Sequence, residues 1–120
     1  MKRNEDCIRS IMIYLEENLS QNKSIKVMDL YCCLPEYSKE DINESALIIL
    51  ERKLAEKKNM DGCSARTIKF SRITDKGHNY LDAIRDETVW KTLKDKFSGF
   101  LTPENIISMF QMILKSNGIL

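Results

Sequence analysis

The chain has 120 residues, of which 42% are hydrophobic and 31% are charged, an ordinary composition for one globular domain with a single core. No apolar run approaches the roughly 20 residues that a membrane-spanning helix requires. The N-terminus is polar and acidic after Lys2 and Arg3, so it does not read as a signal peptide. We therefore expect a cytoplasmic protein that does not contact a membrane.

The net charge of +1 is unevenly distributed along the chain. Residues 1–51 carry 6 basic and 10 acidic side chains, and residues 73–120 carry 6 of each. Residues 52–72 carry 7 basic and 2 acidic side chains, a local net charge of +5. Such a stretch favours contacts with DNA phosphates, which supply most non-specific affinity. The alternative is a solvated basic surface that balances the acidic N-terminal part of the chain.

The first predicted helix covers residues 5–19, with Asn4 as its N-cap. Its apolar residues recur at helical spacing and form one stripe: Ile8, Ile11, Met12, Leu15 and Leu19. Residues 25–34 follow neither a period of two nor one of 3.6, so a short strand and an irregular buried segment both fit.

A second helix is expected to begin after Ser38, because the acidic Asp41 three residues later resembles a capping box. We expect this helix to reach Lys57 or Lys58. Residues 46–50 are apolar nearly all round, which predicts a central position.

Residues 60–64 and 67–73 are predicted to form the two strands of a hairpin. The turn falls either at residues 64–66 or at Asp61-Gly62, which is itself a strong turn signal.

A third helix is expected to begin at Thr74 or Asp75 and to end at Ser98-Gly99. Residues 85–88 either interrupt this helix or form its polar face. Trp90 is predicted to lie in the core, and Gly77 to permit close packing near the helix start. The last helix, residues 103–117, begins with Pro103 and has a wide apolar face.

The residues around the third helix carry a resemblance to a known family. They follow the order Ile-Thr-x-x-Gly-His, then Leu-Asp-x-Ile-Arg-Asp, then Val-Trp, at Ile73, Thr74, Gly77, His78, Leu81, Asp82, Ile84, Arg85, Asp86, Val89 and Trp90. This pattern resembles the domain-of-unknown-function 2513 family of bacterial and prophage proteins. Lys58-Asn59 departs from it, since the family usually has a glycine there. The resemblance implies a winged-helix fold and a phage or prophage setting, and it implies no catalytic residues.

Neither the histidine nor the cysteines indicate a catalytic or metal site. His78 and Asp82 are four residues apart and could touch on a helix, but no Ser or Cys is placed by motif to complete a catalytic arrangement. The cysteines are Cys7, Cys32, Cys33 and Cys63, without a Cys-x-x-Cys pair. We expect reduced thiols that pack as small hydrophobic side chains, with no metal, no cofactor and no enzymatic activity.

These observations predict a mostly helical α+β protein, namely a winged helix-turn-helix with an additional C-terminal helix. We expect a winged-helix domain at residues 1–97, and an amphipathic helix within residues 98–120 that packs on it or pairs across a homodimer. The candidate dimer contacts are Ile106, Phe110, Ile113 and Leu114. In the winged-helix reading, the helix after Ser38 occupies the recognition position, where its early carboxylates would face DNA unfavourably.

The leading functional hypothesis is a regulatory protein that binds double-stranded DNA through a basic wing. Its candidate DNA contacts are Arg52, Lys53, Lys57, Lys58, Arg66, Lys69 and Arg72. The alternative is a protein-interaction module that binds a host or phage protein and has no nucleic-acid role.

Overall fold

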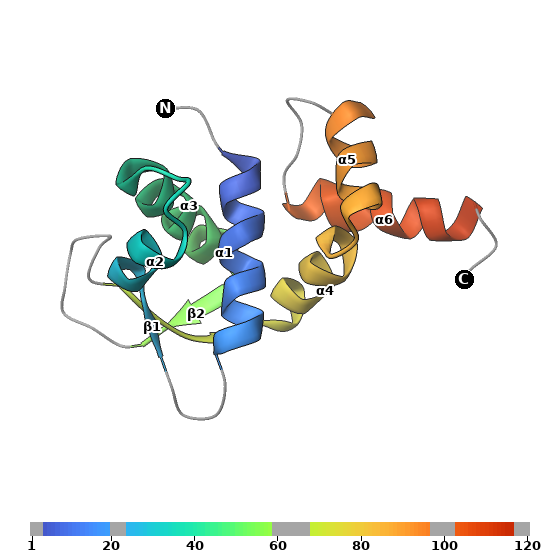
Figure 1. Cartoon of the computed structure of the whole chain (residues 1–120). Helices are drawn as coiled ribbons and strands as arrows, with labels where there is room; N and C mark the ends of the chain where they lie inside the picture. Colours follow the sequence, from blue (N-terminus) through green and yellow to red (C-terminus); the bar gives the residue numbers. More distant parts are fainter. Residues whose placement is uncertain (1–3, 20–23, 59–67, 97–102, 117–120) are drawn as a thin grey trace. The chain divides into compact units, whose positions relative to one another are not determined.

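The computed structural model describes residues 4–19, 24–58, 68–96 and 103–116 (Figure 1). The chain divides into two compact units, Met1–Gly77 and His78–Leu120. The elements, in chain order, are α1 (Glu5–Asn18), β1 (Ile25–Lys26), α2 (Val27–Cys33), α3 (Lys39–Glu51), β2 (Ala55–Lys57), β3 (Lys69–Ile73), α4 (Asp75–Ile84), α5 (Glu87–Lys96) and α6 (Pro103–Ser116). The predicted class, mostly helical α+β, is confirmed. The predicted domain boundary near residue 97 remains a prediction.

Helix α1 forms as the sequence predicts, and it packs against α3. The Asn4 side chain accepts a hydrogen bond from the backbone N–H of Cys7 at 3.0 Å, so Asn4 is the N-cap. The buried residues of α1 are Cys7, Ile8, Ile11, Met12 and Leu15. Because each of these side chains leaves water on folding, this single stripe contributes much of the first unit's core.

Residues 25–34 form a two-residue strand followed directly by a two-turn helix, which explains their mixed pattern. Ile25, Val27 and Leu30 are buried, whereas the large apolar side chain of Met28 is 50% exposed. The backbone N–H of Val27 donates to the carbonyl oxygen of Ile68 at 2.9 Å, so sheet pairing continues into the first residue of α2. Because the segment changes from the two-residue period of a strand to the 3.6-residue period of a helix within a few residues, neither period can be recognised in the sequence.

Helix α3 begins where predicted but ends earlier. The Ser38 hydroxyl oxygen accepts from the backbone N–H of Asp41 at 3.0 Å, which confirms the predicted cap. The predicted continuation to Lys57 or Lys58 is wrong, because the helix ends at Glu51. Lys53 then adopts a left-handed backbone conformation, with φ of 60°, that an α-helix cannot continue.

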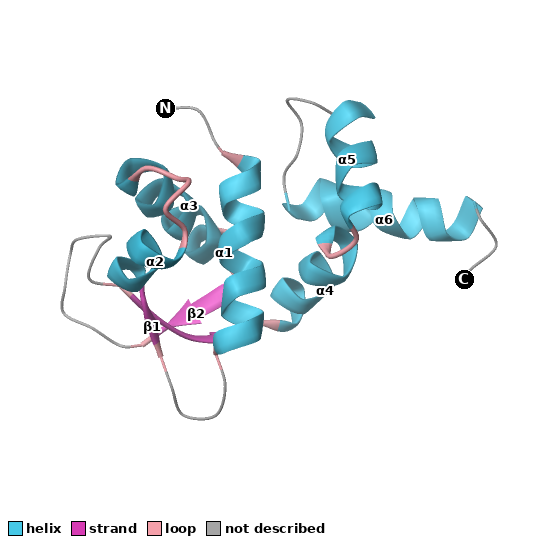
Figure 2. Ribbon diagram, in the orientation of Figure 1, coloured by secondary structure: helices cyan, strands magenta, loops and turns pink. Residues whose placement is uncertain are grey.

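The three strands form an antiparallel sheet in the order β1-β3-β2 (Figure 2). Ile25 lies opposite Phe70, and both side chains are buried. On the other side of β3, Lys57 pairs with Phe70 and Glu56 with Arg72, so a bulge occurs at this point. The second predicted hairpin strand is confirmed as β3, and the described strand that pairs with it on this side is β2, residues 55–57. The predicted first strand, residues 60–64, and both predicted turns fall within residues 59–67, which lie outside the described residues.

The second unit contains α5, α6 and most of α4, and α5 contacts α6. Of the two alternatives left open for residues 85–88, the structure shows the interruption, since α4 ends at Ile84 and α5 begins at Glu87. The Asp86 carboxylate accepts from the backbone N–H groups of Thr88 at 2.7 Å and Val89 at 3.1 Å, which caps α5. Trp90 is 2% exposed, as predicted for a core residue. Among the described helices, none has both the length and the apolar character needed to cross a bilayer.

Candidate nucleic-acid interface

Three lysines lie side by side across the three strands of the sheet. Lys26 of β1 is directly opposite Lys69 of β3. Lys58, the residue after β2, donates its backbone N–H to the carbonyl oxygen of Lys69 at 2.9 Å from the other side. Neighbouring strands are about 4.8 Å apart, so the three Cα atoms form a short line across the sheet. We call Lys26, Lys69 and Lys58 the lysine row.

The lysine row places like charges next to one another. Within the described part of the chain, no ion pair involves any of its three side chains. Lys26 and Lys58 are exposed and Lys69 is half-buried. The nearby Asp29 carboxylate accepts from the backbone N–H of Lys26 at 3.3 Å. Like charges directly opposite one another destabilise a sheet, so a bound anion would relieve a repulsion that folding creates.

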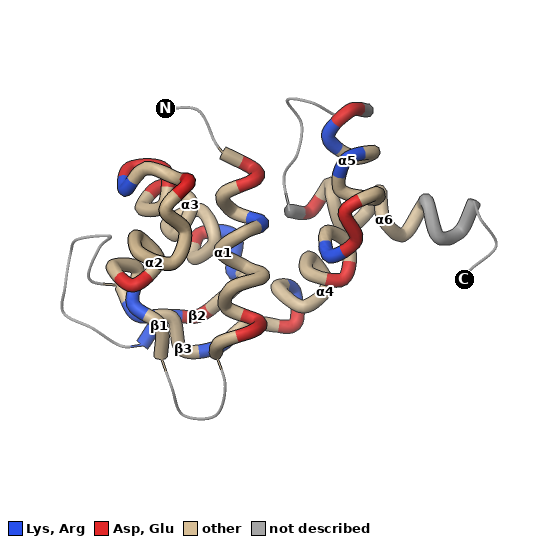
Figure 3. The backbone as a smooth tube through the Cα atoms, viewed as in Figure 1, with Lys and Arg blue, Asp and Glu red and all other residues tan. Residues whose placement is uncertain are grey.

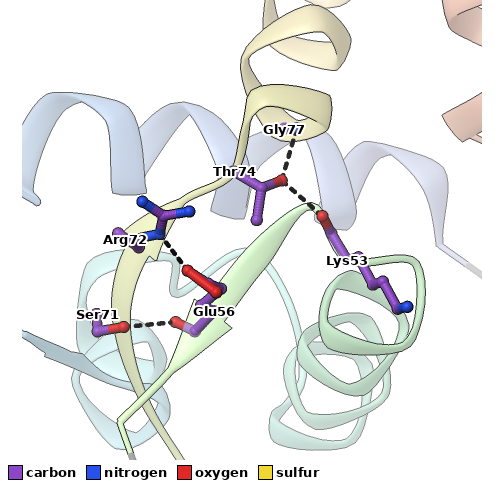
Figure 4. Close-up of polar contacts among 6 residues, drawn as sticks. All are labelled: Lys53, Glu56, Ser71, Arg72, Thr74 and Gly77. Carbon is purple, nitrogen blue, oxygen red and sulfur yellow. Dashed lines mark hydrogen bonds and ion pairs between the residues drawn. The ribbon is translucent and has the colours of Figure 1, made fainter.

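Arg72 differs from these lysines because it already has an acidic partner. Its guanidinium forms an ion pair with Glu56 on the neighbouring strand, and the Ser71 hydroxyl donates to the carbonyl oxygen of Glu56 at 3.1 Å (Figure 4). The two charged side chains are 67% and 49% exposed, so the pair contributes little stability. It does neutralise much of the charge that Arg72 was predicted to offer to DNA.

An open cleft lies where α3 gives way to β2. It has a volume of about 440 Å³ and is lined by Leu50, Lys53, Ala55, Glu56, Lys57 and Thr74. The Thr74 hydroxyl donates to the carbonyl oxygen of Lys53 at 2.6 Å and accepts from the backbone N–H of Gly77 at 3.0 Å (Figure 4). Thr74 therefore caps α4 and fixes the turn at Lys53 with the same oxygen atom. We call the cleft lined by these six residues the α3–β2 cleft.

The structure brings together some of the predicted contacts and separates others. Lys53 and Lys57 line the α3–β2 cleft, whereas Lys58 and Lys69 belong to the lysine row. Arg52 is the half-buried C-cap residue of α3. Arg66 lies outside the described residues.

Sequence reasoning missed Lys26, which belongs to the row. Lys26 lies in the acidic N-terminal part of the chain, so no run of basic residues marks it. Its partner Lys69 is 43 positions away in the sequence, and only strand pairing brings the two together. Alternation along β1 gives no signal either, because the strand has two residues.

The exposed face of α3 is acidic, as its sequence predicted. Glu40, Glu44, Leu47 and Glu51 recur at intervals of three and four residues, so they share one side of the helix. Glu40 and Glu51 are exposed, Glu44 is half-buried, and Leu47 is 44% exposed. Figure 3 shows acidic residues along α3, and it shows basic residues on β1 and β3 together with an acidic residue on β2. This face of α3 therefore differs in charge from the lysine row on the sheet.

Helix α6 gives a mixed answer to the dimer hypothesis. Ile106 is fully buried within the chain and Phe110 is half-buried. The side chains of Ile113 and Leu114 lie outside the described residues. Met112 is 68% exposed. A dimer through α6 remains a prediction.

The histidine and the cysteines occupy separate places. His78 and Asp82 are both exposed. The Asp82 carboxylate lies 3.3 Å from the Arg85 guanidinium, so its described partner is Arg85 and not His78. Cys7 is buried as predicted, but Cys32 and Cys33 are exposed, so the prediction that the cysteines pack as hydrophobic residues is wrong for that pair. Within the described residues, no group of three or more His, Cys, Asp or Glu side chains could hold a metal ion.

Comparison with known proteins places the chain in a family. A family model described as "Hypothetical protein (DUF2513)" matches residues 2–99. The chain belongs to this family. It is also similar to a protein of Haemophilus influenzae named "Uncharacterized protein", with 30% identity over 98 residues that cover 78% of this chain and 76% of the relative. No solved structure matches the chain.

The DUF2513 match covers both of the basic features described above. The lysine row and the α3–β2 cleft lie within residues 2–99, whereas α6 begins at Pro103, beyond the match. The resemblance inferred from residues 73–90 is confirmed. The basic sheet surface is thus part of the DUF2513 region rather than an addition to it.

Proposed function

We propose that this DUF2513 protein binds duplex DNA, through a winged-helix unit whose sheet faces the phosphate backbone. The order helix, strand, helix, helix, strand, strand over residues 5–73 is the order of a winged helix-turn-helix, with α2 and α3 as the helix pair. In the order β1-β3-β2 the strands β2 and β3 are antiparallel neighbours, as the two wing strands of that fold are expected to be. A regulatory role in the phage or prophage setting that the family resemblance implies would suit such a unit.

The observation that carries this proposal is the lysine row. Three adjacent cations without an acidic partner in the described chain repel one another, and a polyanion would remove that repulsion. Phosphate contacts release counterions from DNA, so each contact adds affinity that falls as salt rises. The row is therefore suited to duplex phosphates.

The acidic face of α3 argues for a particular docking mode. In most helix-turn-helix proteins the recognition helix enters the major groove with its N-terminal residues on the bases. Here Glu40 and Glu44 would meet phosphate charge in that position. We infer that the sheet, rather than α3, makes the principal contact, and that the binding depends weakly on base sequence.

Fluorescence anisotropy with a labelled mixed-sequence duplex, measured from 50 to 250 mM KCl, tests this proposal. We expect micromolar binding that weakens steeply with salt, as phosphate contacts require. The variant Lys26→Gln/Lys58→Gln/Lys69→Gln should lose most of that salt dependence, because it removes three cations while keeping similar side-chain lengths.

The matched control is Lys76→Gln/Lys91→Gln/Lys94→Gln, which changes the net charge equally at lysines outside the sheet. It should retain most of the wild-type slope. Equal slopes for the two triple variants would contradict the proposal, since net charge rather than the lysine row would then govern binding.

A second candidate function is protein interaction through α3. The observation that favours it is Leu47, a large apolar side chain that is 44% exposed and flanked by Glu44 and Glu51 on the same face. This combination suits a basic partner with an apolar contact at its centre. Pull-down with the wild-type protein, with Leu47→Arg and with the lysine-row triple variant separates the two functions. A partner that is lost only with Leu47→Arg, in the absence of duplex binding, would favour protein interaction.

A further inference from the structure

We propose that the α3–β2 cleft is a second phosphate site, which holds a backbone phosphate of the same duplex that the lysine row contacts. This inference rests on the proposed DNA binding and adds a separate contact to it. The cleft shares no residue with the row, so the two sites can be tested independently.

The net charge within the cleft is positive even though Glu56 lines it. The Glu56 carboxylate is occupied by the Arg72 guanidinium (Figure 4). No ion pair involves Lys53 or Lys57 among the residues that the structure describes. The ammonium groups of Lys53 and Lys57 are therefore available to bind an anion, because the one carboxylate that lines the cleft is already paired with Arg72.

The backbone oxygens around the cleft are also occupied. The carbonyl oxygen of Leu50 accepts from the backbone N–H of Lys53 at 3.0 Å, and that of Lys53 accepts from the Thr74 hydroxyl at 2.6 Å. The carbonyl oxygen of Leu54 accepts from the backbone N–H of Thr74 at 3.1 Å. Carbonyl dipoles that would otherwise repel a phosphate are thus partly compensated, and the mobile donors that remain are those of the lysines.

Lys53 occupies a position that would suit glycine better. Its φ of 60° lies in the left-handed region, which is unfavourable for a residue with a Cβ atom. Its side chain is exposed, so burial in the core does not explain the lysine. A strained backbone at a residue whose side chain lines a cleft points to a role for that side chain.

The bulge between β2 and β3 occurs at Lys57, the second lysine that lines the cleft. Glu56 and Lys57 are consecutive, but their partners Arg72 and Phe70 are two residues apart, so Ser71 has no partner on β2. Bulges re-aim neighbouring side chains. Although Lys57 lies opposite the buried Phe70, its own side chain is exposed and lines the cleft.

The two sites lie close together along the chain, because Lys57 of the cleft and Lys58 of the lysine row are consecutive residues. At about 3.3 Å per residue, the three steps from Ala55 to Lys58 along the edge strand β2 cover roughly 10 Å. Successive phosphates of one DNA strand are further apart along the backbone than their axial rise of about 3.4 Å, so this length spans neighbouring phosphates rather than a longer run. A backbone that follows β2 would pass the row at Lys58 and then reach the cleft at Lys57 and Lys53.

The test measures salt dependence of duplex binding for the wild-type protein and for four variants. For Lys53→Gln/Lys57→Gln, the negative slope of log K, the association constant, against log salt should become shallower by about 0.9, the value for one phosphate. Binding at 0.1 M salt should weaken about 8-fold. Lys26→Gln/Lys69→Gln should lower the slope separately, and the quadruple variant should show the sum of the two losses. Lys53→Arg/Lys57→Arg, which keeps both charges, should retain the wild-type slope.

Each outcome decides between the two proposals. A wild-type slope for Lys53→Gln/Lys57→Gln, together with a reduced slope for Lys26→Gln/Lys69→Gln, overturns the cleft site and leaves the proposed function intact. A reduced slope for both double variants, with additive losses, supports the cleft site. Absence of duplex binding by the folded wild-type protein at 50 mM KCl overturns both proposals.

Discussion

The first turn of α4 passes so close to the carbonyl oxygen of Leu54 that a Cβ atom at Gly77 would lie 2.0 Å from it. The Ile73 side chain would be 2.6 Å away from the same Cβ. Because the obstructing oxygen belongs to the backbone, it cannot move aside as a flexible side chain could. We expect Gly77→Ala to lower the free energy of unfolding by about 1–3 kcal/mol, as overpacking does. Urea denaturation measures the change.

Asn79→Ala is the control for that substitution, because Asn79 is exposed on the same helix. It should change stability by no more than about 0.5 kcal/mol. Equal stability of the two variants would show that α4 can shift away from Leu54 without loss.

Thr74 supports two elements with one hydroxyl group. It donates to the carbonyl oxygen of Lys53 and accepts from the backbone N–H of Gly77. Thr74→Val keeps the shape but removes both hydrogen bonds, so we expect a loss of about 1–2 kcal/mol. Thr74→Ser keeps the hydroxyl and should lose less than half as much in the same urea titration. Similar losses for both variants would mean that the methyl group, rather than the hydrogen bonds, is what stabilises this junction.

The sequence predicted the elements whose signals are local. The N-caps at Asn4 and Ser38 each bind a backbone N–H three residues later, and the start of α4 at Thr74 follows the same rule. The apolar stripe of α1 and the close packing at Gly77 were also predictable, because spacing and the absence of a Cβ atom are visible in the sequence itself.

Two features could not be predicted from the sequence, for the same physical reason: the end of α3 and the lysine row. Lysine is a good helix former, so nothing local marks Lys53 as the residue that breaks the helix. Its conformation is held by Thr74, which is 21 residues further along. The row likewise depends on pairing between Lys26 and Lys69. Tertiary contacts, rather than propensity, decide both features.

The conformation of Lys53 leads to a prediction about stability. With φ of 60°, any residue that has a Cβ atom carries a steric penalty of roughly 1–2 kcal/mol that glycine avoids. Glycine gives back part of this gain through the greater freedom of the unfolded chain. Lys53→Gly should therefore be more stable than Lys53→Ala by about 0.5–1 kcal/mol in urea titrations, although both remove the same charge. The reverse order would show that the turn relaxes in the variants.

The buried thiol of Cys7 predicts how stability changes at alkaline pH. Burial raises the pKa of Cys7 above its ordinary value of 9.0, and the nearby carboxylates of Asp41 and Glu36 raise it further, while a hydrogen bond with Ser45 acts in the opposite direction. Above about pH 9 the unfolded chain releases this proton while the folded protein retains it. The free energy of unfolding should thus fall as pH rises, by up to about 1.4 kcal/mol per pH unit for one proton, until the raised pKa is reached.

Urea titrations between pH 8 and pH 10.5 test this dependence with two alanine variants. Cys7→Ala should be less stable at pH 8, because it leaves a cavity, but its stability should fall less steeply with pH. Cys32→Ala, at an exposed position on α2, should keep the wild-type dependence. Tyr37, whose pKa is raised by burial, would account for part of the slope that remains in Cys7→Ala. An unchanged slope in Cys7→Ala would mean that other groups carry the alkaline transition.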